Sequence, residues 1–390
     1  MRNTVKKAAK FSATGMMLTA VVMLSGCSLY SSLFAGKKES NPPTPLTDFK
    51  STETLKTVWS RSVGKSDSFV FSPAFAAGSI YAAAANGNVV RLDVATGAEV
   101  WRINAGMSLT AGVGSDGNTT VVVGEKGVVL AFDSNGKERW RAQGPSVVLS
   151  APAVGQELVV VRSMDNHITA YDASTGERRW SAVRAAPALT LRTAPGIAMA
   201  AQTAFVALPG GKLSALALNN GGARWEIPVG DPRGTTELER ISDVSGMPAL
   251  IGRDICAVAY QGRIGCFDVA NGALRWIKDF SSDVGLGIDE RFVFAADEKG
   301  AVVEFARDTG AALWRNNKLA YRQLSAPVSF RNTVAVGDYQ GYVHFLSRED
   351  GAFAARTATD GSAIVANPVA ADNIVVFQTQ AGTVVALAVQ

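Results

Sequence analysis

The 390-residue sequence predicts an all-β fold, an eight-bladed β-propeller of four-stranded antiparallel blades. A Gly-x-Val strand returns eight times, and in six of these copies a turn and a tryptophan follow it. These strands carry apolar residues at positions of both parities, so both faces must be covered. A proline also precedes most units at a constant distance. Closed rings of stacked blades satisfy all three observations.

The Gly-x-Val strand is the most regular element of the repeat. Its copies begin at Gly87, Gly127, Asn166, Gly211, Gly262, Gly300, Gly341 and Gly382. Apolar residues stand two and five positions after each start, as Val89 and Leu92 do in the first copy. Two tandem sandwiches would instead leave one face of each sheet exposed to water, so apolar and polar residues would alternate along each strand. The pattern therefore favours blades packed between other blades.

A turn and a tryptophan strand follow. The turn is usually Asp-x-x-Thr/Asn-Gly, as in residues 93–97, where Asp accepts backbone hydrogen bonds and Gly supplies a positive φ. All tryptophans of the protein belong to this series: Trp59, Trp101, Trp140, Trp180, Trp225, Trp276 and Trp314. We expect each indole to fill the space between blades and to face small residues such as Ala131 and Ala170.

The proline-marked strand and the chain ends complete the ring. A proline lies 14 positions before the first residue of five units: Pro73, Pro152, Pro248, Pro327 and Pro368. Proline tolerates an edge position, so we expect this strand to line the central channel, followed by a β-branched strand such as residues 158–162. Residues 382–390 lack a tryptophan strand, whereas Trp59 lacks the three strands before it. The two ends should share one blade in a propeller spanning residues 55–390.

Residues 1–26 are expected to be a lipoprotein signal peptide. A basic start precedes an apolar stretch, residues 11–24, that is too short to span a bilayer comfortably. The stretch ends in Leu-Ser-Gly-Cys, which resembles a bacterial lipobox, so Cys27 is expected to carry acyl chains that anchor the protein in the membrane. An ordinary signal peptide with an incidental cysteine is the alternative. Ser28 rather than aspartate follows Cys27, which by the lipoprotein sorting rule favours the outer membrane.

Residues 27–54 predict a lipidated flexible tether, because they are polar and rich in proline at their centre.

The net charge argues against one class of partner. The signal peptide holds four basic and no acidic residues, so the remaining chain has 34 of each sign. Nucleic-acid binding needs a basic surface and is not expected.

Two insertions indicate where a partner would bind. The longest intervals between successive tryptophans, 45 and 51 residues, follow Trp180 and Trp225. Both insertions join the outer strand of one blade to the inner strand of the next, so they should lie side by side at one end of the ring. Long loops on a rigid scaffold often carry binding residues.

The first insertion, residues 185–194, places Leu189 and Leu191 beside Arg192. Leucines flanking an arginine suit a small interface core, although they could equally fold back into a blade. The second insertion, residues 231–246, is charged and includes Asp243.

Candidates for catalysis are few, and no catalytic residue, metal site or cofactor is predicted. No acidic cluster has metal-ligand spacing. His167 and His344 lie in or beside Gly-x-Val strands, where a packed or surface imidazole is expected. Residues 112–117 spell GxGxxG, but a strand follows instead of a helix, so they form an inter-strand turn.

Cys256 and Cys266 flank a hairpin and should lie almost opposite one another. They form either a disulfide in an oxidising compartment or two packed thiols.

The tryptophan units resemble the repeats of the pyrroloquinoline quinone propellers. With the lipobox and the stretch TTELERISDV, residues 235–244, the mature chain resembles the BamB family of lipoproteins. This resemblance implies a non-enzymatic scaffold on the periplasmic face of the outer membrane, within the Bam complex. There it would bind the POTRA domains of BamA, help outer-membrane proteins to fold and insert, and contact nascent chains.

Two alternatives to this scaffold stay open: a quinoprotein dehydrogenase and a propeller that binds an envelope polymer. The dehydrogenases of the same superfamily use adjacent cysteines, a Ca²⁺ site and an aspartate base. Here the two cysteines are ten residues apart.

The resemblance also implies which residues bind BamA. Leu189, Leu191 and Arg192 match the family's leucine-leucine-arginine loop, and Asp243 matches its acidic loop. Ser245 stands where relatives can place a second acid, so that charge is missing here.

Overall fold

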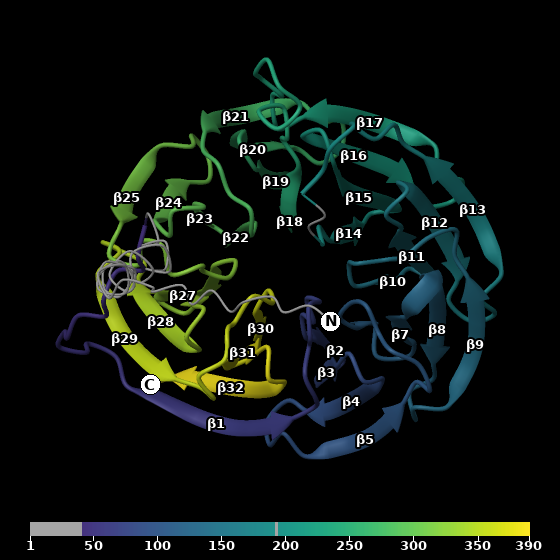
Figure 1. Ribbon diagram of the computed structural model, residues 1–390, viewed down its shortest axis with the longest axis horizontal. Coiled ribbons are helices and arrows are strands. Elements are labelled where there is room, and N and C mark those ends of the chain that lie inside the picture. The colour runs from purple at the N-terminus through teal and green to yellow at the C-terminus, as the bar shows by residue number, and fades with distance from the viewer. Residues whose placement is uncertain (1–40, 192–193) are drawn as a thin grey trace, which may run out of the picture. The chain divides into compact units, whose positions relative to one another are not determined.

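The computed structural model describes residues 41–191 and 194–390. The proposed signal peptide and Cys27 therefore lie outside the described residues. In residues 43–390, eight four-stranded antiparallel sheets are arranged in a ring as blades (Figure 1). The predicted eight-bladed propeller is confirmed. We number the blades in chain order, beginning with the sheet that contains β2.

Each blade is an up-and-down sheet whose first strand lies toward the centre of the ring. The innermost strands are β2 (Ala74–Ala76), β6 (Gly114–Ser115), β10 (Ala153–Gly155), β14 (Ile197–Ala200), β18 (Val244–Ile251), β22 (Leu286–Ile288), β26 (Val328–Phe330) and β30 (Val369–Ala371). The second strands are β3 (Ser79–Ala83), β7 (Thr120–Val123), β11 (Leu158–Arg162), β15 (Thr203–Leu208), β19 (Asp254–Ala259), β23 (Phe292–Ala296), β27 (Thr333–Gly337) and β31 (Ile374–Gln378).

The outer half of each blade carries the repeat unit. The third strands are β4 (Asn88–Asp93), β8 (Val128–Phe132), β12 (His167–Asp172), β16 (Lys212–Ala217), β20 (Arg263–Asp268), β24 (Val302–Ala306), β28 (Tyr342–Ser347) and β32 (Thr383–Val389). The outermost strands are β5 (Glu99–Asn104), β9 (Glu138–Gln143), β13 (Arg178–Val183), β17 (Ala223–Pro228), β21 (Leu274–Asp279), β25 (Ala312–Asn316), β29 (Phe353–Ala358) and β1 (Leu55–Ser62). A 3₁₀ turn, η1 (Glu125–Gly127), precedes β8. The GxGxxG stretch, residues 112–117, spans β6 and the start of the hairpin that leads to β7, and a strand rather than a helix follows it, as expected.

The two chain ends complete the eighth blade. β1 pairs antiparallel with β32, and Leu55 lies opposite Val389. Because this pairing joins the first strand of the ring to the last, the ring is closed by backbone hydrogen bonds, as predicted.

The tryptophans connect seven of the eight blades to the next one. Each indole N–H donates to a backbone carbonyl in the turn between the third and fourth strands of the following blade, at 2.5 to 3.3 Å. Ala131 and Ala170 pack in the same core clusters as Trp140 and Trp180, as expected, although each alanine belongs to the same sheet as its tryptophan. Each indole also covers the turn glycine of the next blade.

Gly176 illustrates this contact. Its φ is +74°, and a Cβ added there would lie 2.5 Å from the Trp140 ring. The glycine of the turn motif therefore serves two purposes, since it permits the left-handed backbone and leaves room for an indole. The repeat predicted the first purpose only.

The contact between blades seven and eight differs from the other seven. Ala355 pairs with Phe345 as Trp140 pairs with Ala131, so an alanine occupies the tryptophan position of blade seven. Blade eight offers no turn there, because its third and fourth strands belong to opposite ends of the chain. The Gln390 N–H donates to the Thr54 carbonyl at 2.9 Å across this gap.

Residues 44–53 differ from the tether expected over residues 27–54. Thr44 donates its N–H to the Ala320 carbonyl at 2.9 Å, and Thr52 donates to Ala354 at 2.9 Å. Phe49 stacks on Phe353 with ring centroids 5.2 Å apart. We call residues 44–53 the strap, because they lie along the outside of blade seven. Among the described residues, no helix has the length and apolar character needed to cross a membrane.

Candidate partner-binding site

The two insertions emerge at one end of the propeller. The first loop, residues 185–194, joins β13 to β14, and the second loop, residues 231–243, joins β17 to β18. In an up-and-down blade, connections between blades share an end with the hairpins between second and third strands. We call this the loop-bearing end, and the opposite one the turn end, because it holds the turns that contact the indoles.

The first loop presents apolar surface. Leu189 is 41% exposed, whereas Leu191 is partly buried. Residues 185–188 are exposed as well. Arg192, the third residue expected in this loop, lies outside the described residues. The alternative in which both leucines fold into a blade does not hold for Leu189.

Asp243 joins the two loops from beneath. One carboxylate oxygen accepts the Leu191 N–H at 2.7 Å, and the other accepts the Gly210 N–H at 2.9 Å. The predicted adjacency of the loops is confirmed by this contact. Asp243 is only 4% exposed, however, so it differs from the surface acid that the resemblance suggested. Its oxygens are occupied inside the protein.

Arg162 balances the buried charge of Asp243. It is 8% exposed at the end of β11 and donates to the Asn166 side-chain oxygen at 3.1 Å. Burial lowers the pKa of Arg162 to about 10, and the negative charge of Asp243 opposes that shift. The arginine stays protonated at neutral pH, so the base of the first loop is held by two opposite charges in a region of low solvent access.

The second loop folds on itself. The Glu239 carboxylate accepts the N–H groups of Thr235 and Thr236 at 2.8 and 3.0 Å, and these hydrogen bonds lower its pKa. Glu237 lies 3.4 Å from Arg240. The charges of the loop are therefore paired locally.

Two exposed apolar residues were missed by the sequence reasoning. Leu238 is 68% exposed between the paired charges of the second loop, and Met247 is 51% exposed on β18. Met247 adjoins the end of the first loop, because Gly196 donates its N–H to Gly246 at 3.0 Å. Leu238 could have been noticed as a lone apolar residue within TTELER, whereas Met247 fits an ordinary strand pattern.

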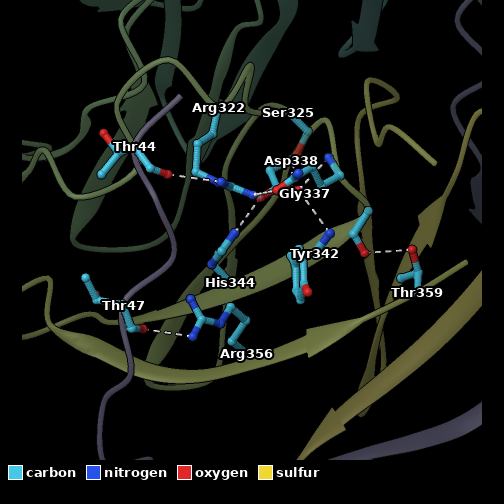
Figure 2. A network of polar contacts seen from close by, with 12 residues as sticks. Thr44, Thr47, Arg322, Ser325, Gly337, Asp338, Tyr342, His344, Arg356 and Thr359 are labelled. Atoms are coloured by element: carbon cyan, nitrogen blue, oxygen red, sulfur yellow. Dashed lines mark hydrogen bonds and ion pairs between the residues drawn. The ribbon is translucent and has the colours of Figure 1, made fainter. Parts of the chain in front are cut away.

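His344 is a packed histidine, as expected. It is fully buried, and its Nε2 lies 2.9 Å from the Asp338 carboxylate, which also pairs with Arg322 (Figure 2). Burial lowers the pKa of His344, so the ring is neutral at pH 7. His167 lies partly exposed beside Asp165. The described residues contain no group of three or more His, Cys, Asp or Glu side chains that could hold a metal ion.

Cys256 and Cys266 lie directly opposite one another on β19 and β20 and form a disulfide. Both are fully buried. Of the two arrangements that the sequence left open, the structure has the disulfide. It joins the second and third strands of one blade.

Comparison with known proteins points to one family. The model of the family described as outer membrane protein assembly factor BamB matches residues 85–316 and 298–390. The chain is 43% identical to a protein of that name from Burkholderia pseudomallei, over 96% of this chain and 97% of the relative. It is 45% identical to the one from Bordetella pertussis, over 95% of each.

Solved structures give the same fold. The crystal structure of BamB from Moraxella catarrhalis superposes with a TM-score of 0.79 at 27% identity, covering 86% of this chain and all of that one. A quinohemoprotein alcohol dehydrogenase from Comamonas testosteroni superposes with a TM-score of 0.67 at 15% identity, over 86% of this chain and 76% of that one. The second likeness concerns the fold alone.

Proposed function

This chain belongs to the BamB family of outer membrane protein assembly factors, and from that premise we propose that it is a non-enzymatic scaffold that binds the POTRA domains of BamA. The binding surface consists of the first and second loops at the loop-bearing end. Leu189, Leu191 and Arg192 supply its contacts. The propeller holds these loops at a fixed place within the Bam complex.

The observation that carries this proposal is the buried carboxylate of Asp243. It fixes the backbone of Leu191 in a loop whose Leu189 side chain remains exposed. An apolar residue held on a rigid base loses less conformational freedom on binding than one in a mobile loop. Such an arrangement supports a binding surface, because burying Leu189 against the propeller would have stabilised the free protein instead.

Asp243 acts as a positioning residue in this proposal. Its carboxylate contacts the backbone of the first loop and is too buried to form the centre of an interface. Replacing it changes the shape of the loop, and with it the affinity for BamA. Asp243, which the family resemblance assigned to direct binding, thus contributes to binding indirectly, by holding the first loop in shape from a buried position.

We place the protein at the periplasmic face of the outer membrane, held by acyl chains on Cys27. The lipobox-like sequence before Cys27 supports this anchor. Contact with nascent outer-membrane proteins occurs along the open edges of outermost strands, by β-strand addition. Unchanged folding yields of porins after deletion of the protein would contradict that last step.

The loop surface is tested by co-purification from envelopes. We expect Leu191→Asp or Arg192→Glu to abolish recovery of BamA while the thermal melt stays nearly unchanged. Leu274→Asp is the matched control, since Leu274 is 58% exposed on β21, outside both loops. Recovery of BamA with the loop variants, or its loss with the control, would refute the proposed surface.

A further inference from the structure

The strap occupies a built site on blade seven. Arg322 is 2% exposed and donates to the Thr44 carbonyl at 3.1 Å, while Arg356 donates to the Thr47 carbonyl at 2.9 Å (Figure 2). Both arginines therefore donate hydrogen bonds to the backbone of the strap. The site on blade seven is thus charged and rigid, whereas the strap that it binds has no regular secondary structure.

A buried network fixes Arg322 before the strap is added. Asp338 accepts the Arg322 Nε–H at 2.8 Å, and its other oxygen accepts the N–H groups of Gln340 and Tyr342. Burial raises the pKa of Asp338, but the hydrogen bond from His344 and the other donors outweigh it, so this pKa lies below its ordinary value. The carboxylate is ionised at neutral pH and holds the guanidinium in place.

Apolar contacts hold the middle of the strap. Phe49 stacks on Phe353, and the Arg356 guanidinium lies 5.1 Å from the Phe49 ring centroid. Leu46 packs with Phe49 against the buried side chains of Leu319 and Phe353. The strap thus covers the blade beside the contact that lacks a tryptophan.

The strap also runs from one end of the propeller to the other. Thr44 bonds to Ala320 in the connection between β25 and β26, which is at the loop-bearing end. Residues 52 and 53 bond to Ala354 near the start of β29, at the turn end, where β1 also begins. Thr44 consequently lies at the loop-bearing end, although the first strand of the ring starts at the turn end.

We infer that the strap attaches the membrane-anchored N-terminal segment to the loop-bearing end of the propeller. The loop-bearing end is thereby held toward the membrane. The inference rests on the anchor at Cys27 included in the proposed function. Thr44 lies 17 positions after Cys27, and a chain of that length reaches about 60 Å, whereas a free chain up to Leu55 would reach about 100 Å. Docking of the strap therefore shortens the free segment between Cys27 and the propeller, and it determines where on the propeller that segment is attached.

The test is the orientation of the acylated, full-length mature protein in nanodiscs with acceptor-labelled headgroups. A donor dye is attached at Glu125→Cys or at Asn135→Cys, which lie at the loop-bearing and turn ends of blade two. The native Cys256 and Cys266 are paired, so the added thiol is free for labelling. Mass spectrometry of the Cys27 peptide establishes the acylation separately.

We expect stronger energy transfer from position 125 than from position 135 in the otherwise unaltered protein. Phe49→Ala with Arg356→Ala releases the strap, so the difference should vanish and trypsin should cleave after Lys50 more rapidly. Arg291→Ala with Phe292→Ala is the matched control, since it removes another arginine over a phenylalanine, 4.8 Å apart, at the turn end of blade six. That control should keep the difference in transfer.

Equal transfer from the two positions before the strap is altered would overturn the inference. So would an unchanged difference in the strap variant, or unchanged cleavage after Lys50. Binding of BamA by the strap variant is measured alongside and is expected to persist. A failure of the loop surface would instead appear as BamA binding by the loop variants, so the two failures are distinguishable.

Discussion

The contacts that hold the ring together and the contacts that shape the loops differ in chemistry and in number. Seven blade-to-blade contacts repeat one solution, an indole over a turn glycine with its N–H on a carbonyl. The first loop depends on a single buried carboxylate, Asp243. Stability is therefore distributed around the ring, whereas the shape of the binding surface is concentrated in one residue.

The largest loss of stability is expected from Trp180→Ala. Trp180 is 8% exposed and donates its N–H to the Leu218 carbonyl, so the change leaves a cavity and an unpaired acceptor. We expect a decrease of about 3–5 kcal/mol in the free energy of unfolding, measured by denaturant titration. A loss below about 1 kcal/mol would show that the ring does not depend on its indoles.

Asp243→Ala should lower both stability and binding. It leaves the Leu191 and Gly210 N–H groups unpaired and Arg162 without its neighbouring charge. We expect a loss of about 2–4 kcal/mol in unfolding free energy, and a loss of BamA affinity as well. Asp243→Asn keeps one acceptor oxygen and should be milder in both respects. Full affinity in the alanine variant would contradict a positioning role.

Gly176→Ala separates the two purposes of the turn glycine. An added Cβ meets both a positive φ and the Trp140 ring, so we expect a loss of about 2–4 kcal/mol. Gly252→Ala is the matched control, because Gly252 has a φ of +55° and nothing within 4 Å of an added Cβ. It should cost only about 1 kcal/mol. Equal losses would mean that indole packing adds nothing to the conformational penalty.

The smallest effect concerns Glu304, which stands opposite Trp314 where blades two, three, four and eight have alanine. Burial, aided by nearby Asp289, raises the pKa of Glu304 from 4.5 to about 7. A carboxyl with a raised folded pKa binds more protons in the folded state, so stability falls as pH rises from about 4.5 to 7. Glu304→Gln should remove this slope and stabilise the protein at pH 8 by at most about 3 kcal/mol. Parallel stability curves for the two proteins would contradict it.

The ring could be predicted because it repeats. Glycine, proline and tryptophan spacings recur every blade, and the unmatched strand at residues 382–390 indicated closure with Trp59. The position of the indoles over glycines of the next blade could not be predicted, since spacing along the chain does not show which blade a side chain faces.

The docked strap and the burial of Asp243 could not be predicted from the sequence. The strap has no periodicity, and its arginines lie 278 and 309 residues away from the carbonyls that they bind. Asp243 lies in a charged stretch, which ordinarily indicates a solvated surface, and its burial depends on Arg162 from another blade. Tertiary contacts decide both features.

The central claim is that the ring provides stability and the first loop provides binding. The most direct test is to titrate purified BamA against the Leu189→Asp and Leu274→Asp variants and to record a thermal melt of each variant. Each variant adds one charge at an exposed leucine. We predict that Leu189→Asp weakens BamA binding by about thirtyfold or more, that Leu274→Asp leaves it unchanged, and that both melt like the unaltered protein. Equal affinities for the two variants would contradict the account.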